Sequence, residues 1–208
     1  MKRQLPFDLI YQIAALLLAI IVVHLVYITV IRPNADAILT AQAEAAAAGG
    51  AYVQDRSLYV VLRDYEQEAC FVLMFWSIAI MGYKARNALR ERSLLGDDIV
   101  RVSEGMSVLP EDTREYTRAV QALPPESQNF LLPRTLMAAL QRFASTRNVQ
   151  DVSEAVRNVC EAESDRLDSE LSTVRYIAWA IPSIGFIGTV RGIGEALGQA
   201  YRAVEGDI

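Results

Sequence analysis

The residues best suited to chemistry lie in one glycine-rich segment, residues 176–200. Thr189 stands near the middle of its apolar stretch, and its hydroxyl can donate one hydrogen bond and accept two without titrating. Facing a pore, this hydroxyl could bond a carboxylic acid or an ordered water. In an ordinary membrane helix it would instead bond back to a carbonyl of its own helix. The sequence leaves both interpretations open.

Arg191 and Glu195 follow on one face of the same segment, one helical turn apart. Ionisable side chains inside a membrane are costly and usually face a bundle interior or water. The two residues can therefore line an ion path and pair with each other. Alternatively, both can lie at the outer interface with their charged ends in water.

Small residues and a proline shape this segment further. Gly188 and Gly192 are four residues apart, a spacing that lets membrane helices approach closely, and Gly185 stands one turn before Gly188. Pro182 removes a backbone hydrogen bond and can kink the helix. So many glycines weaken a helix unless close packing compensates, which predicts a helix that faces protein or water rather than lipid.

Membrane helices must position these residues, because charge is missing from three windows of the chain. The 208 residues include 20 Lys and Arg and 25 Asp and Glu, but none of these falls in 9–31, 69–83 or 176–190. The first window exceeds the roughly 20 residues that cross a bilayer, and the roughly 7–15 of a signal peptide. A simple water-soluble domain is excluded. The hydrophobic content of 52% with two Cys also excludes a disordered or disulfide-framework protein.

The basic residues set the expected orientation, because Lys and Arg favour the cytoplasmic ends of membrane helices. They flank the first window on its N-terminal side and crowd the exit of the second. We expect an all-α, polytopic membrane protein whose long membrane helices extend into a helical cytoplasmic domain, with the N-terminus inside. The predicted parts are the N-terminal end with the first membrane helix (1–31), an Ala-rich periplasmic segment (32–68), the second membrane helix (69–83), the cytoplasmic helical domain (84–175), the pore-type helix (176–200) and the start of an outer loop (201–208).

Local patterns predict where helices begin and end. Pro33 is expected to end the first helix. Asn148 is a predicted N-cap, with Asp151 in the first turn that follows it. No Gly or Pro separates Val149 from Ile181, so one continuous helix is expected to enter the membrane there.

Nothing else in the sequence indicates catalysis. His24, the one His, is expected to be a hydrogen-bonded side chain near a helix end, and Cys70 and Cys160 are not expected to form a bridge. This set offers no metal-ligand cluster, and no nucleophile elbow or phosphate-binding loop is present. We expect no catalytic residue, metal or cofactor, and a protein that is not an enzyme. The net charge of −5 argues against nucleic acid as a partner.

The run PSIGFIGTVRGI, residues 182–193, resembles the core membrane motif of the MotA/TolQ/ExbB proton channel family. The shared pattern is Pro-x-x-Gly-x-x-Gly-Thr-Val-x-Gly-Ile, preceded by a long cytoplasmic helix. Two crossings before the cytoplasmic domain resemble the MotA arrangement more than that of TolQ and ExbB. Two departures are Arg191, where an aromatic is frequent in TolQ- and ExbB-like members, and the end at Ile208, where the family continues with one more membrane helix. That helix is therefore expected to be missing from this chain.

The resemblance implies a proton- or sodium-conducting, stator-type subunit of the bacterial inner membrane. Such subunits form a ring, typically a pentamer, around a single-span partner like MotB, TolR or ExbD, whose intramembrane Asp carries the proton. Thr189 would line the ion path and bond that carboxyl, and Pro182 would couple helix bending to the cytoplasmic domain. Gly185, Gly188 and Gly192 would permit tight packing in the ring. The alternative is a non-conducting membrane scaffold whose cytoplasmic helices bind a partner.

Overall fold

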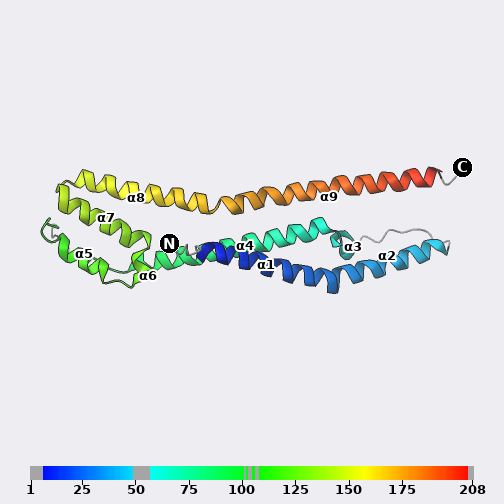
Figure 1. Ribbon diagram of the computed structural model, residues 1–208, viewed down its shortest axis with the longest axis horizontal. Coiled ribbons are helices and arrows are strands. Elements are labelled where there is room, and N and C mark those ends of the chain that lie inside the picture. Colours follow the sequence, from blue (N-terminus) through cyan, green and yellow to red (C-terminus); the bar gives the residue numbers. More distant parts are fainter. Residues whose placement is uncertain (1–6, 49–56, 101, 103–104, 106–107, 206–208) are drawn as a thin grey trace, which may run out of the picture. The chain divides into compact units, whose positions relative to one another are not determined.

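Every regular element in the described part of the chain is helical. The computed structural model describes residues 7–48, 57–100, 102, 105 and 108–205, and these contain no strand (Figure 1). The predicted all-α class is confirmed. In chain order the elements are α1 (Phe7–Val26), the π-helical turn η1 (Tyr27–Ile31), α2 (Arg32–Ala47), α3 (Leu58–Leu62), α4 (Tyr65–Ser93), the 3₁₀ turn η2 (Leu94–Gly96), α5 (Thr113–Gln121), α6 (Pro125–Gln128), α7 (Leu131–Thr146), α8 (Val149–Glu170) and α9 (Ser172–Glu205).

These helices form two compact units. The first comprises Met1–Met81 and Thr173–Ile208, and the second comprises Gly82–Ser172. The first unit contains α1, α2, α3, the N-terminal part of α4 and nearly all of α9. The second contains the rest of α4 together with α5 to α8.

Three helical stretches are long and apolar enough to cross a membrane. They are Asp8–Ala45, Tyr65–Gly96 and Val149–Gly198. Each contains one of the three charge-free windows, so the chain is a multi-pass membrane protein of the predicted kind. A bilayer core needs roughly 20 residues of helix, and each stretch exceeds that length.

The first helix does not end at Pro33, contrary to the sequence expectation. It widens into the π-turn η1, in which the Arg32 N–H bonds to the Tyr27 carbonyl, and continues as α2. A prolyl ring clashes with the carbonyl four residues earlier in a regular α-helix. The wider turn shifts the hydrogen bonding by one residue and avoids that clash. The Asn34 side-chain amide donates to the Val30 carbonyl at 2.6 Å, so this carbonyl of the turn has a hydrogen-bond partner.

The helix expected to run unbroken from Val149 to Ile181 has one interruption, at Leu171. Its ψ of −6° departs from the helical value of about −42°, and α9 starts at the next residue. Neither Gly nor Pro is needed for so small a change, which is why the sequence does not reveal the break. The predicted N-cap is confirmed, since the Asn148 side-chain oxygen accepts from the Gln150 N–H at 3.0 Å.

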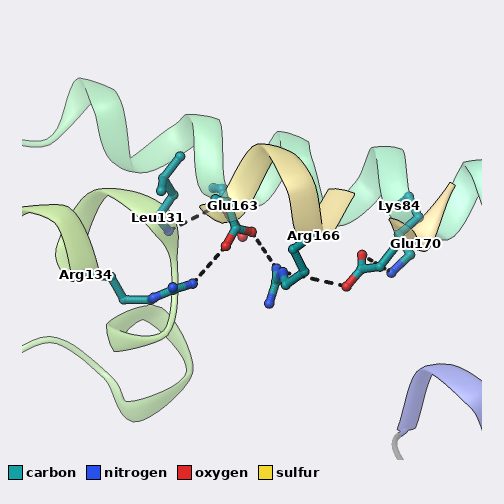
Figure 2. Close-up of polar contacts among 7 residues, drawn as sticks. Lys84, Leu131, Arg134, Glu163, Arg166 and Glu170 are labelled. Carbon is teal, nitrogen blue, oxygen red and sulfur yellow. Dashed lines mark hydrogen bonds and ion pairs between the residues drawn. The ribbon is translucent and has the colours of Figure 1, made fainter. Parts of the chain in front are cut away.

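In the second unit, a buried carboxylate joins α7 to α8 (Figure 2). The Glu163 side chain is 6% exposed. One of its oxygens lies 2.9 Å from Arg134 Nη1 on α7, and the other lies 2.6 Å from Arg166 Nη2 on α8. Both oxygens are therefore paired, as a buried carboxylate requires.

A second carboxylate joins α8 to α4. Glu170 Oε2 lies 2.6 Å from Lys84 Nζ, and Oε1 lies 3.7 Å from Arg166 Nε. Arg166 therefore stands between two acids, and Figure 2 shows the side chains as a row. Nearby, Glu91 on α4 accepts from the Leu131 N–H at 3.4 Å, where α7 begins.

Replacing the buried carboxylate should weaken this unit. Glu163→Gln leaves two guanidinium groups without their anion, and we expect it to lower the free energy of unfolding by about 1–3 kcal/mol. Glu161→Gln on the exposed side of α8 is the matched control and should change it by less than about 0.5 kcal/mol. Chemical denaturation of the full chain in detergent measures both. Equal effects of the two substitutions would contradict the assigned role of Glu163.

Candidate functional site

Two helices of the first unit, α4 and α9, approach each other closely at Gly188. A Cβ atom built at this glycine would lie 3.4 Å from the Cβ of Glu66, at the lower limit of ordinary contact. Two turns earlier on α9, the Ile181 carbonyl accepts from Cys70 Sγ at 3.6 Å. Because Cys70 lies one turn after Glu66 on α4, the two helices run antiparallel. A larger side chain at Gly188 would push them apart.

The other glycines named from the sequence make no such approach within this chain. A Cβ at Gly185 or Gly192 would meet no atom within 4 Å. Their role in packing between chains stays a prediction. Pro182 lies inside α9 as predicted, and the neighbouring Ser183 hydroxyl donates to the Trp179 carbonyl at 2.9 Å.

A cleft of about 450 Å³ lies between the two helices on one side of this contact. Both helices contribute to its walls, with a polar end near α3 and an apolar end farther along α4. The lining residues are Leu62, Glu66, Gln67, Cys70, Phe71 and Met74 before or on α4, and Ile181, Gly185, Gly188 and Thr189 on α9. The glycines widen the cleft because they present no side chain to it.

Two oxygens of the residues that line the cleft have no hydrogen-bond partner. They are Glu66 Oε2 and Gln67 Oε1, and both atoms are shielded from solvent. Buried polar atoms are nearly always paired, so each unpaired acceptor needs an explanation such as a water or an ion. These acceptors are suited to a proton donor or a small cation.

Thr189 lines the same cleft, and its hydroxyl donates to the Gly185 carbonyl at 3.0 Å. The bond to its own helix, which the sequence offered as the ordinary alternative, is therefore present. It uses the hydroxyl hydrogen and leaves lone pairs on the oxygen. Thr189 can thus act as an acceptor at the cleft while it remains bonded to its own helix.

Arg191 binds carboxylates from both helices. Its guanidinium lies 2.8 Å from Asp64 Oδ2 and 2.9 Å from Glu66 Oε1, and its Nε lies 3.5 Å from Glu195 Oε1. The predicted pair with Glu195 exists, but the two contacts to α4 and the residue just before it are shorter. Glu195 is mostly exposed, whereas the Glu66 side chain is only 14% exposed. The stronger pairing is therefore the one that crosses between helices.

Sequence reasoning missed Asp64 and Glu66 as partners of Arg191. Acids stand at positions 64, 66 and 68, immediately before the second charge-free window. Acidic residues are common at the N-terminal end of a helix because they interact favourably with its dipole. The dipole alone therefore accounts for these acids, without any basic partner. The close spacing of three acids next to an apolar window was the feature that could have indicated basic partners on another helix.

Glu68 forms a separate network on the opposite side of α4. His24 Nδ1 lies 2.5 Å from Glu68 Oε1, and Arg32 pairs with the other oxygen. The Arg32 guanidinium also lies over the Tyr65 ring, 4.4 Å from its centroid. His24 is thus a hydrogen-bonded side chain, in the way the sequence predicts. This network ties the first membrane helix to α4.

The described residues contain no group of three or more His, Cys, Asp and Glu side chains placed to hold a metal ion. Cys70 and Cys160 are both free thiols. The polar groups that the cleft residues supply are a carboxylate, a side-chain amide, one hydroxyl and the Cys70 thiol.

The close contact at Gly188 leads to a testable expectation. Gly188→Val should destabilise the α4–α9 pair by about 1–3 kcal/mol, because its Cβ would already touch Glu66 and its two methyl groups need further space. Gly194→Val is the matched control, since a Cβ at Gly194 meets no atom within 4 Å of the same chain. Thermal unfolding in detergent compares the two variants. A Gly188 variant as stable as the Gly194 variant would show that the contact is unimportant.

Comparison with known proteins gives a match to a family profile. The chain matches no curated protein and no solved structure in the corresponding comparisons. Residues 127–205 match the profile of the MotA/TolQ/ExbB proton channel family. This range includes α7, α8, Thr189 and the other residues of the 182–193 motif. The match therefore confirms the resemblance over residues 127–205, which include that motif.

Proposed function

We propose that this protein is the ion-conducting subunit of a stator-type complex in a bacterial inner membrane. It would use a proton or sodium gradient to drive mechanical work or transport through a partner. The N-terminus and the second unit would lie in the cytoplasm. The Asp64–Glu66 end of α4 would then face the periplasm, in agreement with the distribution of basic residues.

The observation that carries this proposal is the cleft between α4 and α9, whose α9 wall lies in the matched segment. Thr189 lines it from α9, while Glu66 and Gln67 supply unpaired oxygens from α4. Oxygen acceptors in a membrane-embedded cleft are a recurrent means of passing protons or small cations. Together with the family match, they support assigning Thr189, Arg191 and Glu195 to the ion path.

A partner and further copies of the chain would complete the path. Large apolar side chains on α9 are open in the single chain, with Trp179 75% and Phe186 70% exposed. Lipid or protein must cover such surfaces. Gly185 and Gly192 have open space beside them, so another helix could approach closely there. We infer a homo-oligomer, in the family a pentamer, around a single-span MotB-, TolR- or ExbD-like partner with an intramembrane Asp.

Ion flux through vesicles containing the full-length protein and its co-purified partner tests the proposal. Thr189→Val keeps the shape but removes the hydroxyl, and we expect flux to fall by about tenfold or more, the equivalent of one lost hydrogen bond. Thr189→Ser should stay within about threefold of the wild-type flux. Thr173→Val, a threonine of the same helix outside the cleft, is the matched control and should leave flux unchanged.

The competing function is a non-conducting scaffold whose cytoplasmic helices bind a partner. It predicts no flux above that of empty vesicles, and no difference between Thr189→Val and Thr173→Val in any activity of the complex. Either result, with the partner present, would rule out the channel assignment.

A further inference from the structure

We propose that Arg191 is a tethered cation that occupies the carboxylate site at the Asp64–Glu66 end of the cleft and closes that end to a passing cation. The inference rests on the proposed function and adds a gate to it. When the guanidinium moves away, Glu66 becomes available to the transported ion. Arginine is suited to this role because it stays charged in proteins and binds carboxylates with several donors.

Glu66 connects the gate to the cleft. Its Oε1 lies 2.9 Å from Arg191 Nη1, while its Oε2 is buried, unpaired and part of a residue that lines the cleft. Glu66 therefore both binds the guanidinium and contributes to the wall of the cleft. A cation that enters at this end meets the positive charge of Arg191 first, and it must compete with Arg191 for Glu66.

The surroundings of Arg191 also offer it a second resting place. Asp64 and Glu195 both contact it, and their side chains are 43% and 66% exposed. Arg191 can release Glu66 and remain paired with these two exposed acids. A purely structural ion pair would need only one carboxylate, whereas this arrangement of three acids around one guanidinium permits an exchange of partners at modest cost.

Labelling of the native Cys70 thiol can report whether Arg191 closes the cleft. It lines the cleft one helical turn beyond Glu66, and Cys160 is the only other thiol in the chain. In a Cys160→Ser background, a reagent that reaches the cleft from the Arg191 end can label Cys70 alone. A cationic, membrane-impermeant methanethiosulfonate is the suitable probe, because its charge resembles that of the transported ion.

The experiment measures the rate of Cys70 labelling in vesicles with the reagent added to one side and then to the other. Arg191→Gln should raise the rate from the Arg191 side by about tenfold, since it removes the two short ion pairs with Asp64 and Glu66 and the positive charge. Arg191→Lys keeps the charge and should stay within about twofold of wild type. Arg63→Gln is the matched control, because it removes an arginine from an exposed pair with Asp36 outside the cleft, and it should have no effect.

A second variant that should also open the gate keeps the test valid if Arg191→Gln does not fold. Asp64→Asn leaves the cleft lining intact and loosens Arg191, and we expect a rise of about threefold, as for one weakened contact. Wild-type labelling rates in both Arg191→Gln and Asp64→Asn would overturn the gate.

Ion flux in the same vesicles separates the two proposals. Faster labelling without flux in any variant would contradict the channel and leave the closure standing, whereas flux without any change in labelling would contradict the closure alone.

Discussion

The acids at the N-terminal end of α4 must be paired, because an ionised group in a membrane environment is costly without a partner. Glu66 and Glu68 are two residues apart and therefore lie on opposite faces of the helix. Glu66 binds Arg191 on α9, and Glu68 binds Arg32 and His24 on the first membrane helix. Each acid thus holds one neighbouring helix, and α4 becomes the central element of the first unit.

The cleft follows from this pairing together with the small residues of α9. The Arg191 ion pairs join the middle of α9 to the N-terminal end of α4, and Gly188 lets α9 approach the Glu66 side chain. The glycines of α9 present no side chain to α4, so space remains between the helices. Glu66 and Gln67 line that space, and each has a buried oxygen without a hydrogen-bond partner. The Thr189 hydroxyl adds an acceptor whose position is held by its bond to Gly185.

The sequence predicts the features that depend on local pattern. Three charge-free windows identify the three spans, and the Asn148 cap is recognisable from residue type and spacing. Features that depend on distant partners were not predictable. Arg191 and Asp64 are far apart in the chain, and no local rule pairs them. The π-turn before Pro33 escaped prediction because proline usually ends a helix, and a wider turn is the less common solution.

The central claim is that the α4–α9 cleft belongs to an ion path inside an assembled ring. An electron cryo-microscopy structure of the full-length protein with its partner in a lipid nanodisc tests this most directly. The account predicts a closed ring in which Thr189 and Glu66 face the interior, toward the membrane helix of the partner. A structure in which Thr189 faces lipid, or in which the chains do not form a ring, would contradict it.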